Sequence, residues 1–437
     1  MALYLSAKQR RDHMDTFITR TEKIPFYQHY DIIVAGGGVA GAAAALAAAR
    51  EGKQVLLIEK TCILGGLATI GHVNFFVPMC NGRGKQIISG MAEEFLQLSV
   101  RYGYDTIPKE WKNGEPAEPT NVRYVTRFSP WIFAIAMTDL LISSGVKILF
   151  DTIVEDVIMD EQVCKGLLIL NKSGRSYCTA SAYIDATGDA DILYRAGVPT
   201  VQGKNYFTYY GFAATVDSCR KVAETGNFAF LNAGGVNGGK INLYGDNQPA
   251  DVPLYKGTDG DDVSDYLIRN QLLMFENLKK EPAKSRDILS IPSMPQFRTT
   301  RRIDGDVTLK ESDAYRHFED SVGAICDFDR RDYLYEIPYG TLVHEGFPNL
   351  ITAGRSASGE GYAWDILRVI PPAIVSGQAA GIAAAQSIDS GSGLDKLSLE
   401  PLQRAMEKGG NRIHFDDALI PAGNTEAADT HADIGHI

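Results

Sequence analysis

The chain has 437 residues, with 43 Lys and Arg against 54 Asp and Glu, which gives a net charge of −11. This length supports two domains with substantial cores, and the acidic balance argues against nucleic acid or an anionic membrane surface as a partner. No apolar run reaches the length of a membrane span, and no signal peptide is predicted. The six cysteines are scattered without a C-x-x-C pair, so we expect free thiols and a cytoplasmic protein.

A glycine turn between two strands follows a polar arm at residues 1–29. Residues 31–35 form an apolar, β-branched run typical of a buried strand. Gly36, Gly38 and Gly41 then fit the pattern G-x-G-x-x-G. The first glycine permits a tight turn, the second lets the backbone approach a diphosphate, and the third lets helix and strand pack closely.

The elements that follow this turn complete a βαβ unit. An alanine-rich helix over 39–50 would direct its free N–H groups at the diphosphate. A second strand over 54–58 leads to Glu59, whose carboxylate would accept hydrogen bonds from an adenosine ribose. The unit predicts a bound dinucleotide but does not separate FAD from NAD.

The next segment adds a feature that NAD-only domains do not need. A glycine pair, Gly65 and Gly66, would bring the chain past the diphosphate a second time. Residues 71–84 mix aromatic and polar side chains and are predicted to form a loop at the site. Helices are expected over 87–102 and, from the Ser-Pro start, over 129–144.

The remaining pattern predicts a return to the same sheet around an insertion. Residues 146–150 indicate a third parallel strand, and three β-runs between 153 and 180 indicate a small antiparallel meander. The segments 183–191 and 349–355 each predict a strand followed by a turn of small residues. Four further elements are expected: a loop-rich stretch over 232–245, and helices over 262–280, 371–387 and 398–408.

These segments resemble the two-dinucleotide-binding flavoproteins of the glutathione-reductase fold, and most closely the bacterial FAD-dependent oxidoreductases. The matching motifs are GGGVAGAAAA at 36–45, LLIEK at 56–60, GGLATIGHVNFFVPMCNGRG at 65–84, DATGDAD at 185–191 and NLITAGRSASGEGYAWDILRVIPPAIVSGQAAGIAAA at 349–385. The resemblance implies an α/β fold, in which a Rossmann-like FAD-binding domain of parallel sheet plus antiparallel β-meander carries an inserted, mixed α+β substrate domain. The expected divisions are 30–110, 140–200 and 336–392 for the FAD-binding domain, 201–335 with parts of 111–139 for the substrate domain, and 393–437 for a C-terminal helix and tail.

The resemblance also implies FAD as the cofactor and assigns its contacts. The glycine turn would hold the diphosphate, Glu59 the ribose, and Val154 the adenine through its backbone. The turn at Gly354 and Arg355 would lie beside the ribityl chain. The helix starting at Pro371 would direct its dipole at the flavin N1/O2 edge, or it is simply a Pro-Pro helix start. The remaining residues expected at the cofactor are Val39, Ala40, Lys60, Gly66, Leu67, Ala68, Thr69, Ala186, Thr187, Gly188, Arg368 and Gln378.

The substrate side is expected in the loop 71–84 and in the inserted domain. His72 stands where the family usually has glycine, and an unperturbed histidine titrates near neutrality, so His72 is a candidate for moving the proton that accompanies hydride transfer. The alternatives are that His72 only packs against the isoalloxazine or that it carries a covalent link to the flavin. Arg298 and Arg302 would share one face of an extended run and grip an anion, or form a solvated edge. His344 is either a base or a surface-turn residue. Further candidates are Asn74, Cys80, Arg301, Tyr339 and Glu360, and no metal site is predicted.

Three functional hypotheses remain open on the sequence. The first is an FAD-dependent dehydrogenase or oxidase that transfers a hydride between flavin N5 and a small organic substrate, for which an anion is one option. The second is an electron-relay flavoprotein subunit, against which the absence of cluster cysteines argues. The third is an NAD-binding protein similar to thiazole synthases. A second strand-anchored glycine motif is missing, so no NAD(P)H domain is expected, and a homo-oligomer is possible.

Overall fold

The computed structural model describes residues 20–422, apart from the side chains of residues 232–234. Its centre is a seven-stranded sheet of order β5-β2-β1-β8-β7-β6, with β16 also paired to β8. The strands are β1 (Phe26–Ala35), β2 (Val55–Ile58), β5 (Lys147–Leu149), β6 (Ile153–Asp160), β7 (Val163–Asn171), β8 (Gly174–Asp185) and β16 (Leu350–Thr352). The pairs β1–β2, β2–β5, β1–β8 and β16–β8 are parallel, whereas β6–β7 and β7–β8 are antiparallel. The predicted fold class is confirmed.

Strand β8 joins two elements that the sequence predicts as separate. We expected a meander strand ending at residue 180 and a new sheet strand beginning at 183. The structure has one continuous strand, because the intervening Ser181 and Ala182 include no glycine or proline to end it and Ala182 is buried in the sheet. Its first half pairs with β7 and its second half with β16, so the meander is an extension of the parallel sheet.

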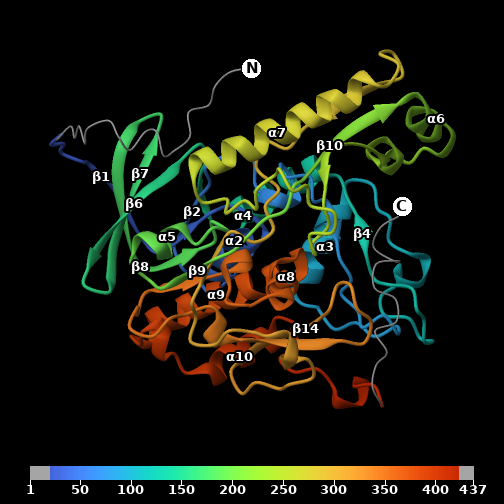
Figure 1. The fold of residues 1–437 in the computed structure, drawn as a ribbon. Helices are drawn as coiled ribbons and strands as arrows, with labels where there is room; N and C mark the ends of the chain where they lie inside the picture. The colour runs from blue at the N-terminus through green and yellow to red at the C-terminus, as the bar shows by residue number, and fades with distance from the viewer. Residues whose placement is uncertain (1–19, 423–437) are drawn as a thin grey trace.

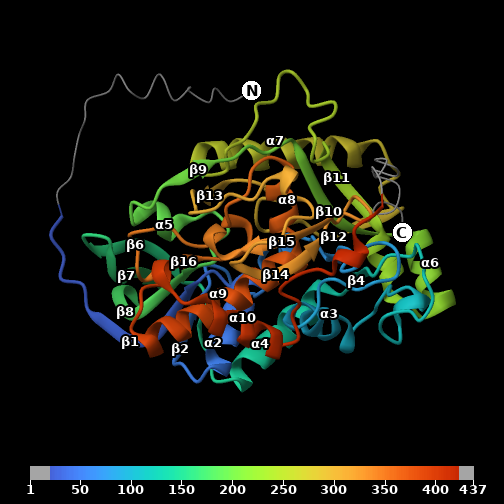
Figure 2. The same cartoon turned by 90° about the horizontal axis from the view of Figure 1, so that it is seen from below.

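The two faces of the sheet are covered differently. Alternate residues of β1 point to opposite faces. Ile32 and Val34 join the core formed with the helices α2 (Val39–Arg50) and α9 (Ile370–Ser390). Ile33 belongs to a smaller core with β7 and the short helix α5 (Asp191–Arg195). Figure 2 shows α2 and α9 together on one side of the molecule, with α3 (Met91–Arg101), α4 (Pro130–Ser143) and α10 (Leu399–Lys408) around them.

A second, smaller sheet has its own core. Its order is β11-β10-β12, formed by Gly234–Lys240, Thr208–Thr215 and Arg286–Ser290. Helix α7 (Gly260–Lys279) packs on β11 and spans the top of the molecule in Figure 1, with α6 (Val216–Thr225) at one side. The shorter pieces are β3 (Phe75–Phe76) with β4 (Thr126–Arg127), β9 (Thr200–Gln202) with β13 (Arg301–Ile303), β14 (Ser321–Cys326) with β15 (Leu334–Pro338), and the helix α8 (Tyr362–Arg368).

The glycine-rich stretch over 232–245, expected to be loop-rich, contains the strand β11 in its first part and a loop only from residue 241. Its glycines allow close packing. A Cβ at Gly239 would lie 2.2 Å from the carbonyl oxygen of Phe207, and one at Gly238 would lie 2.6 Å from that of Asn270. Glycine here therefore reflects what packs against the strand, which a single sequence does not reveal.

The predicted helices are present with small changes at their ends. The helix expected over 87–102 begins only at Met91, because Gly90 has φ +64 and lies against Asn411. The expected arm at 1–29 ends in β1, and its first 19 residues, like the tail from 423, lie outside the described residues. Among residues 20–422 no single helix is long and apolar enough to cross a membrane. The pair α8 and α9, bent by 71°, passes that test only jointly and by length and composition.

The crossing of α2 and α9 generates a stability prediction. A Cβ at Gly381 of α9 would lie 2.2 Å from the carbonyl oxygen of Ala44 in α2, so Gly381→Ala must push the helices apart. We expect a loss of about 1–3 kcal/mol in the free energy of unfolding, measured by urea denaturation. The control Gly260→Ala, at a helix position with open space around it, should stay within about 0.5 kcal/mol of the parent. Equal stability of the two variants would contradict this description of the crossing.

Candidate functional site

A cavity of about 890 Å³ lies where β1, β8 and β16 end. This volume is at the upper end of the range for small-molecule sites. Its lining includes the glycine turn after β1, the second glycine pass at 65–68, the loop at 72–77 and the start of α9. Segments of the smaller sheet and of residues 294–298 complete it. The cavity thus lies at the carboxyl ends of parallel strands, which is where α/β sheets bind ligands.

The glycine turn forms a cradle that opens toward the cavity. Gly36 has φ +102, and a Cβ there would lie 2.3 Å from the carbonyl oxygen of Ala186. A Cβ at Gly41 would lie 1.9 Å from the carbonyl oxygen of Gly36. Gly38, in contrast, has no protein atom within 4 Å of its Cβ position and forms a parallel bridge with Gly65. Two glycines are required by neighbouring backbone, and the third leaves room for a ligand beside the N-terminus of α2.

Glu59 lines the cavity at the end of β2. Only 6% of the residue is exposed, and each carboxylate oxygen accepts one backbone hydrogen bond, from Gly37 N–H and from Thr61 N–H, both at 2.7 Å. These two bonds fix the orientation of the carboxylate while each oxygen keeps a free lone pair. The predicted neighbours Lys60 and Val154 line the same part of the cavity.

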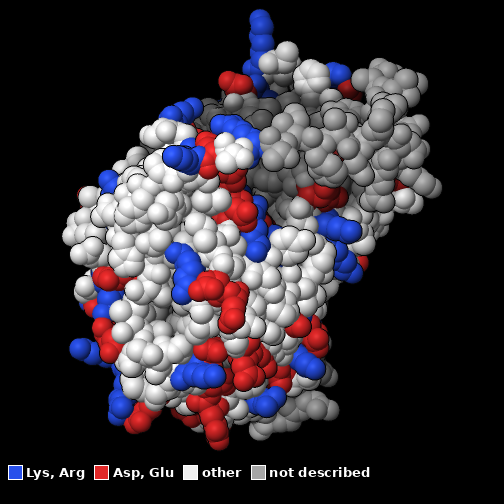
Figure 3. Space-filling view, turned by 90° about the vertical axis from the view of Figure 1, so that its left-hand side faces the viewer, with Lys and Arg blue, Asp and Glu red and all other residues white. Residues whose placement is uncertain are grey.

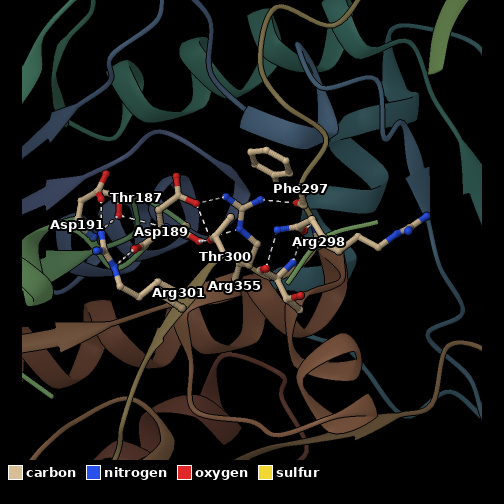
Figure 4. Close-up of polar contacts among 12 residues, drawn as sticks. Thr187, Asp189, Asp191, Phe297, Arg298, Thr300, Arg301 and Arg355 are labelled. Carbon is tan, nitrogen blue, oxygen red and sulfur yellow. Dashed lines mark hydrogen bonds and ion pairs between the residues drawn. The ribbon is translucent and has the colours of Figure 1, made fainter. Parts of the chain in front are cut away.

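A polar network locks the turn after β8 to the turn after β16 (Figure 4). The guanidinium of Arg355 donates to the carbonyl oxygen of Gly188 at 2.7 Å, to the carboxylate of Asp189 at 2.7 Å and to the carbonyl oxygen of Phe297 at 2.6 Å. The carboxylate of Asp189 also accepts from the hydroxyl of Thr300 at 2.6 Å. Each of the three guanidinium nitrogens of Arg355 therefore donates to a protein group, which fixes this side chain at the edge of the cavity.

Asp185 is the last residue of β8 and fixes the turn that follows this strand. It was not predicted as a site residue. Its carboxylate accepts hydrogen bonds from Thr187 N–H at 3.0 Å, Ile192 N–H at 2.9 Å and Leu193 N–H at 3.0 Å. Complete burial raises the pKa of Asp185 to about 6, against the opposing effect of these bonds. The predicted Ala186, Thr187 and Gly188 all line the cavity as a result.

His72 lines the cavity in the segment that follows the second glycine pass. Its ring is stacked on Phe212 with centroids 4.2 Å apart, and meets Trp131 edge-on at 6.0 Å. Nε2 lies 3.0 Å from the hydroxyl of Ser290 in β12. Burial lowers the pKa of His72 to about 4, so the imidazole is neutral at neutral pH. His72 is therefore not the unperturbed histidine that the sequence argument assumed, because apolar rings replace the water that would stabilise its charge.

Three arginines give this part of the cavity a positive lining: Arg127, Arg298 and Arg368. Arg298 donates to the carbonyl oxygens of Ile241 and Asn242 at 3.2 and 3.1 Å. Burial, followed by repulsion from Arg368, lowers the pKa of Arg298 to about 10, so it remains charged at neutral pH. Arg368 is paired with Asp365 of the same helix.

Arg127 is a site residue that sequence reasoning missed. It is the last residue of β4, shortly before α4 begins at Pro130, and its guanidinium carbon is 5.1 Å from the centre of the Phe75 ring. Its Nε is buried and has no hydrogen-bond partner. Arg127 also opposes the rise that burial causes in the pKa of Tyr210, a second unpredicted lining residue. No local pattern indicates Arg127, because it reaches the loop only through the pairing of β4 with β3, which lies about 50 residues earlier in the sequence.

Gln296 is another unpredicted lining residue, and it joins the loop to the smaller sheet. Its Nε2 donates to the carbonyl oxygen of Gly71 at 2.7 Å and to that of Tyr210 at 3.0 Å, while its Oε1 accepts from Tyr210 N–H at 2.7 Å. The loop before His72 is thereby held against β10.

Several predicted substrate residues lie outside the cavity lining. Arg302 donates to the hydroxyl of Ser358 at 2.9 Å, and its guanidinium faces the Trp364 ring. Arg301 pairs with Asp191 at 2.6 Å, and His344 Nδ1 lies 2.6 Å from the carbonyl oxygen of Asp304. The shared face expected for Arg298 and Arg302 does not form, because strand β13 begins only at Arg301. Figure 4 shows Arg298 extending away from the cluster around Arg301.

Two predicted cofactor residues and three further candidates also have other partners. Thr69 donates through its hydroxyl to the carbonyl oxygen of Leu64 at 2.6 Å, and Gln378 accepts from Asn411 at 2.8 Å. Neither lines the cavity. Cys80 is buried, with its pKa raised by burial, Tyr339 donates to the carbonyl oxygen of Leu394, and Glu360 faces Lys310. The lining does include the remaining predicted residues Val39, Ala40, Gly66, Leu67, Ala68, Arg355 and Asn74.

Comparison with known proteins identifies the class to which this site belongs. The family model described as FAD dependent oxidoreductase matches residues 31–228 and 266–406. These ranges include the glycine cradle, Glu59, both locked turns and the start of α9. The match favours FAD over the NAD-binding alternative. No curated protein matches the chain.

Solved structures are similar only at low identity. One is a geranylgeranyl bacteriochlorophyll reductase-like protein from Thermoplasma acidophilum, with 14% identity over 87% of this chain and 83% of that one, and a TM-score of 0.43. Mycobacterium smegmatis Sdh1 in complex with UQ1 has 14% identity over 88% and 73% of the two chains, and a TM-score of 0.44. OxyS anhydrotetracycline hydroxylase from Streptomyces rimosus has 12% identity over 87% and 65%, and a TM-score of 0.40.

The residues of the cavity fit FAD. The space at Gly38 and the N-terminus of α2 suit a diphosphate, and the oriented carboxylate of Glu59 suits a ribose. The N-terminal turn of α9 lines the other part of the cavity through Val369, Ile370 and Ala373, with its positive dipole end toward the space.

The position of Glu59 predicts its effect on FAD binding. In Glu59→Ala two ribose hydroxyls lose a charged acceptor, which is worth about 1.5–3 kcal/mol. We expect the FAD dissociation constant to rise at least about tenfold, measured by the return of FAD fluorescence on dilution. The control Glu51→Ala, an exposed glutamate just after α2, should bind FAD like the parent. Unchanged retention by folded Glu59→Ala protein would show that Glu59 does not contact the ribose.

Proposed function

The chain belongs to the FAD-dependent oxidoreductase family, and from this premise we propose that it transfers a hydride between a small anionic substrate and the flavin. The observation that carries the proposal is the pair Arg127 and Arg298, which both line the cavity. Within residues 20–422 neither forms an ion pair with a carboxylate within 4.0 Å. Two half-buried cations with no carboxylate at ion-pair distance favour an anionic ligand.

The position of these cations relative to the loop supports a substrate role. Bound FAD supplies the N5 atom that accepts or gives a hydride. Arg127 stands beside Phe75 in the loop that leaves the second glycine pass, and Arg298 stands on the segment that follows the smaller sheet. An anionic group held between them would be oriented from two different layers of the protein, which restricts the approach of the attached carbon to one direction.

In the proposed site His72 packs against its neighbours and offers a polar edge, but its imidazole does not change protonation state near neutral pH. Its neutral ring is fixed by Phe212 and by the hydroxyl of Ser290. A neutral imidazole in this position excludes water and presents a hydrogen-bonding edge. It carries no positive charge at neutral pH, so the attraction for an anion comes from the arginines.

The glycine cluster of β11 supports the organic substrate as the direct electron donor or acceptor. Gly235, Gly238 and Gly239 lie against Tyr210, Asn270 and Phe207, so they leave no cradle for a second dinucleotide. A dedicated NAD(P)H site would need the strand, turn and helix context that surrounds Gly36.

The function is tested by anaerobic bleaching of the flavin absorption with a panel of alcohols, amines and hydroxy acids. We expect compounds with a carboxylate to reduce the flavin faster than their methyl esters or amides. Reduction by neutral compounds only, or rapid reduction by NAD(P)H, would contradict the proposal.

A substitution of Arg127 tests whether this arginine binds the anionic group of the substrate. Arg127→Met should weaken binding of an anionic substrate by about 10- to 100-fold, because a hydrogen-bonded charge is lost from a buried site. The measurement is the substrate dependence of flavin reduction in stopped flow. The FAD absorption spectrum should be unchanged. Arg101→Met, which alters an exposed arginine at the end of α3, serves as the control. Parent-like affinity in Arg127→Met would exclude Arg127 from substrate binding.

The lowered pKa of His72 predicts how stability depends on pH. The unfolded chain protonates this imidazole near 6.5 and the folded chain near 4, so the unfolded state binds more protons between these values. Stability should therefore fall as pH decreases from 6.5 toward 4, by up to about 1.4 kcal/mol per pH unit. The variant His72→Phe should lose this dependence, as measured by urea unfolding at several pH values. The control His29→Phe, at an exposed histidine, should retain it. A parent-like slope in His72→Phe would show that His72 is not held neutral.

A further inference from the structure

Two histidines and a buried glutamate meet where the C-terminal segment crosses the hairpin of β14 and β15. Glu336 lies on β15, His317 precedes β14, and His414 follows α10. Nδ1 of His317 is 2.6 Å and Nδ1 of His414 is 3.0 Å from the same oxygen, Oε1 of Glu336. None of the three lines the cofactor cavity, so the cluster is separate from the flavin site.

Glu336 is fixed in place and needs a cationic partner. Its side chain is completely buried, and Oε2 accepts the N–H of Phe318 at 2.8 Å. Within the described part of the chain, no lysine or arginine forms an ion pair with it. A buried carboxylate without a counterion is costly. The group that neutralises Glu336 must therefore lie between its Oε1 and the two imidazoles.

Both imidazoles are oriented toward this position from outside. Nε2 of His317 is 2.8 Å from the carboxylate of Asp417, and its ring is stacked on Phe415 with centroids 4.3 Å apart. The rings of His317 and His414 meet edge to face at 5.4 Å. A carboxylate behind an imidazole is the usual outer partner of a metal-binding histidine, because it fixes the tautomer and increases the basicity of the ligating nitrogen.

We propose that His317, Glu336 and His414 form a binding site for a divalent transition metal, of which Zn²⁺ is the best match. The three donor atoms lie within 4.8 Å of one another. Zinc prefers imidazole and carboxylate donors at about 2.0–2.2 Å, so a small outward movement of the two rings admits the ion. Three protein ligands leave the fourth position to water.

The site has a structural consequence, since its ligands come from parts of the chain that are far apart in sequence. The C-terminal segment is already fastened to β14, where Ala324 N–H donates to the carbonyl oxygen of Arg412 at 2.7 Å and the hydroxyl of Ser321 donates to that of Ile413 at 2.6 Å. A metal ion would add a link between this segment and β15. It is therefore expected to stabilise the folded state by binding it preferentially.

The test is titration of the chelator-treated, FAD-loaded protein with ZnCl₂ by isothermal calorimetry, together with the thermal midpoint. We expect a single site per chain in the parent, and a higher midpoint with zinc than without it. His317→Asn and His414→Asn should abolish this site. Asp417→Asn should weaken it by about 10- to 100-fold, as expected for an outer partner. His29→Asn, at an exposed histidine outside the cluster, should bind zinc like the parent.

Folding of each variant is checked by its FAD absorption and circular dichroism. Asp417 is not a ligand in the proposal and lies at the surface, so Asp417→Asn keeps the test decisive if a histidine variant fails to fold. Zinc binding that is unchanged in Asp417→Asn and in either folded histidine variant would overturn the proposal. So would an absence of saturable zinc binding in the parent, which would mean that a proton on an imidazole neutralises Glu336.

Discussion

The site depends on backbone contacts that are too close for any side chain. Gly41 lies against the carbonyl oxygen of Gly36, Gly36 lies against that of Ala186, and Gly377 of α9 lies against that of Ala40, each with a Cβ position within 2.3 Å of the oxygen. These three contacts join the end of β1, the start of α2, the end of β8 and helix α9 at one point. The unpaired N–H groups of α2 are consequently held rigidly beside the cavity. A methyl group at any of the contacts would shift a helix and with it the phosphate cradle.

The charge of the whole chain is a poor guide to the charge that a ligand meets. The protein carries a net charge of −11, and on the face shown in Figure 3 acidic and basic side chains are interspersed. Inside the cavity Arg127 and Arg298 stand without carboxylate partners among the described residues. Surface charges beyond about 8–10 Å are screened by salt, whereas buried ones are screened much less. The local arginines therefore decide which ligand is attracted, and an acidic protein can present a cation-lined site.

Sequence reasoning succeeded where the determinants are local. The unit from Gly36 to Glu59 is a continuous stretch in which each residue type has its own mechanical reason, so its strands, helix and cradle were predictable. The boundary between the meander and the sheet was not predictable, because β8 continues through Ser181 and Ala182 and pairs with different strands along its length. The partners of Arg298 and Arg302 were not predictable either. Period-two reasoning applies only inside a strand, and β13 starts after Arg298.

His72 shows why position and chemistry are predictable to different degrees. Its place beside the flavin-binding motif follows from the chain, and the structure puts it in the cavity lining. Its protonation state is set by burial against Phe212, which lies 140 residues away in the sequence, and against Trp131. Because these groups exclude water, the imidazole stays neutral where a solvated histidine would titrate. The positive field of the site must then come from arginines, and Arg127 is the one that no local motif indicates. Contacts between residues far apart in the sequence thus determine both roles: the neutral imidazole of His72 and the charged side chain of Arg127 that attracts an anion.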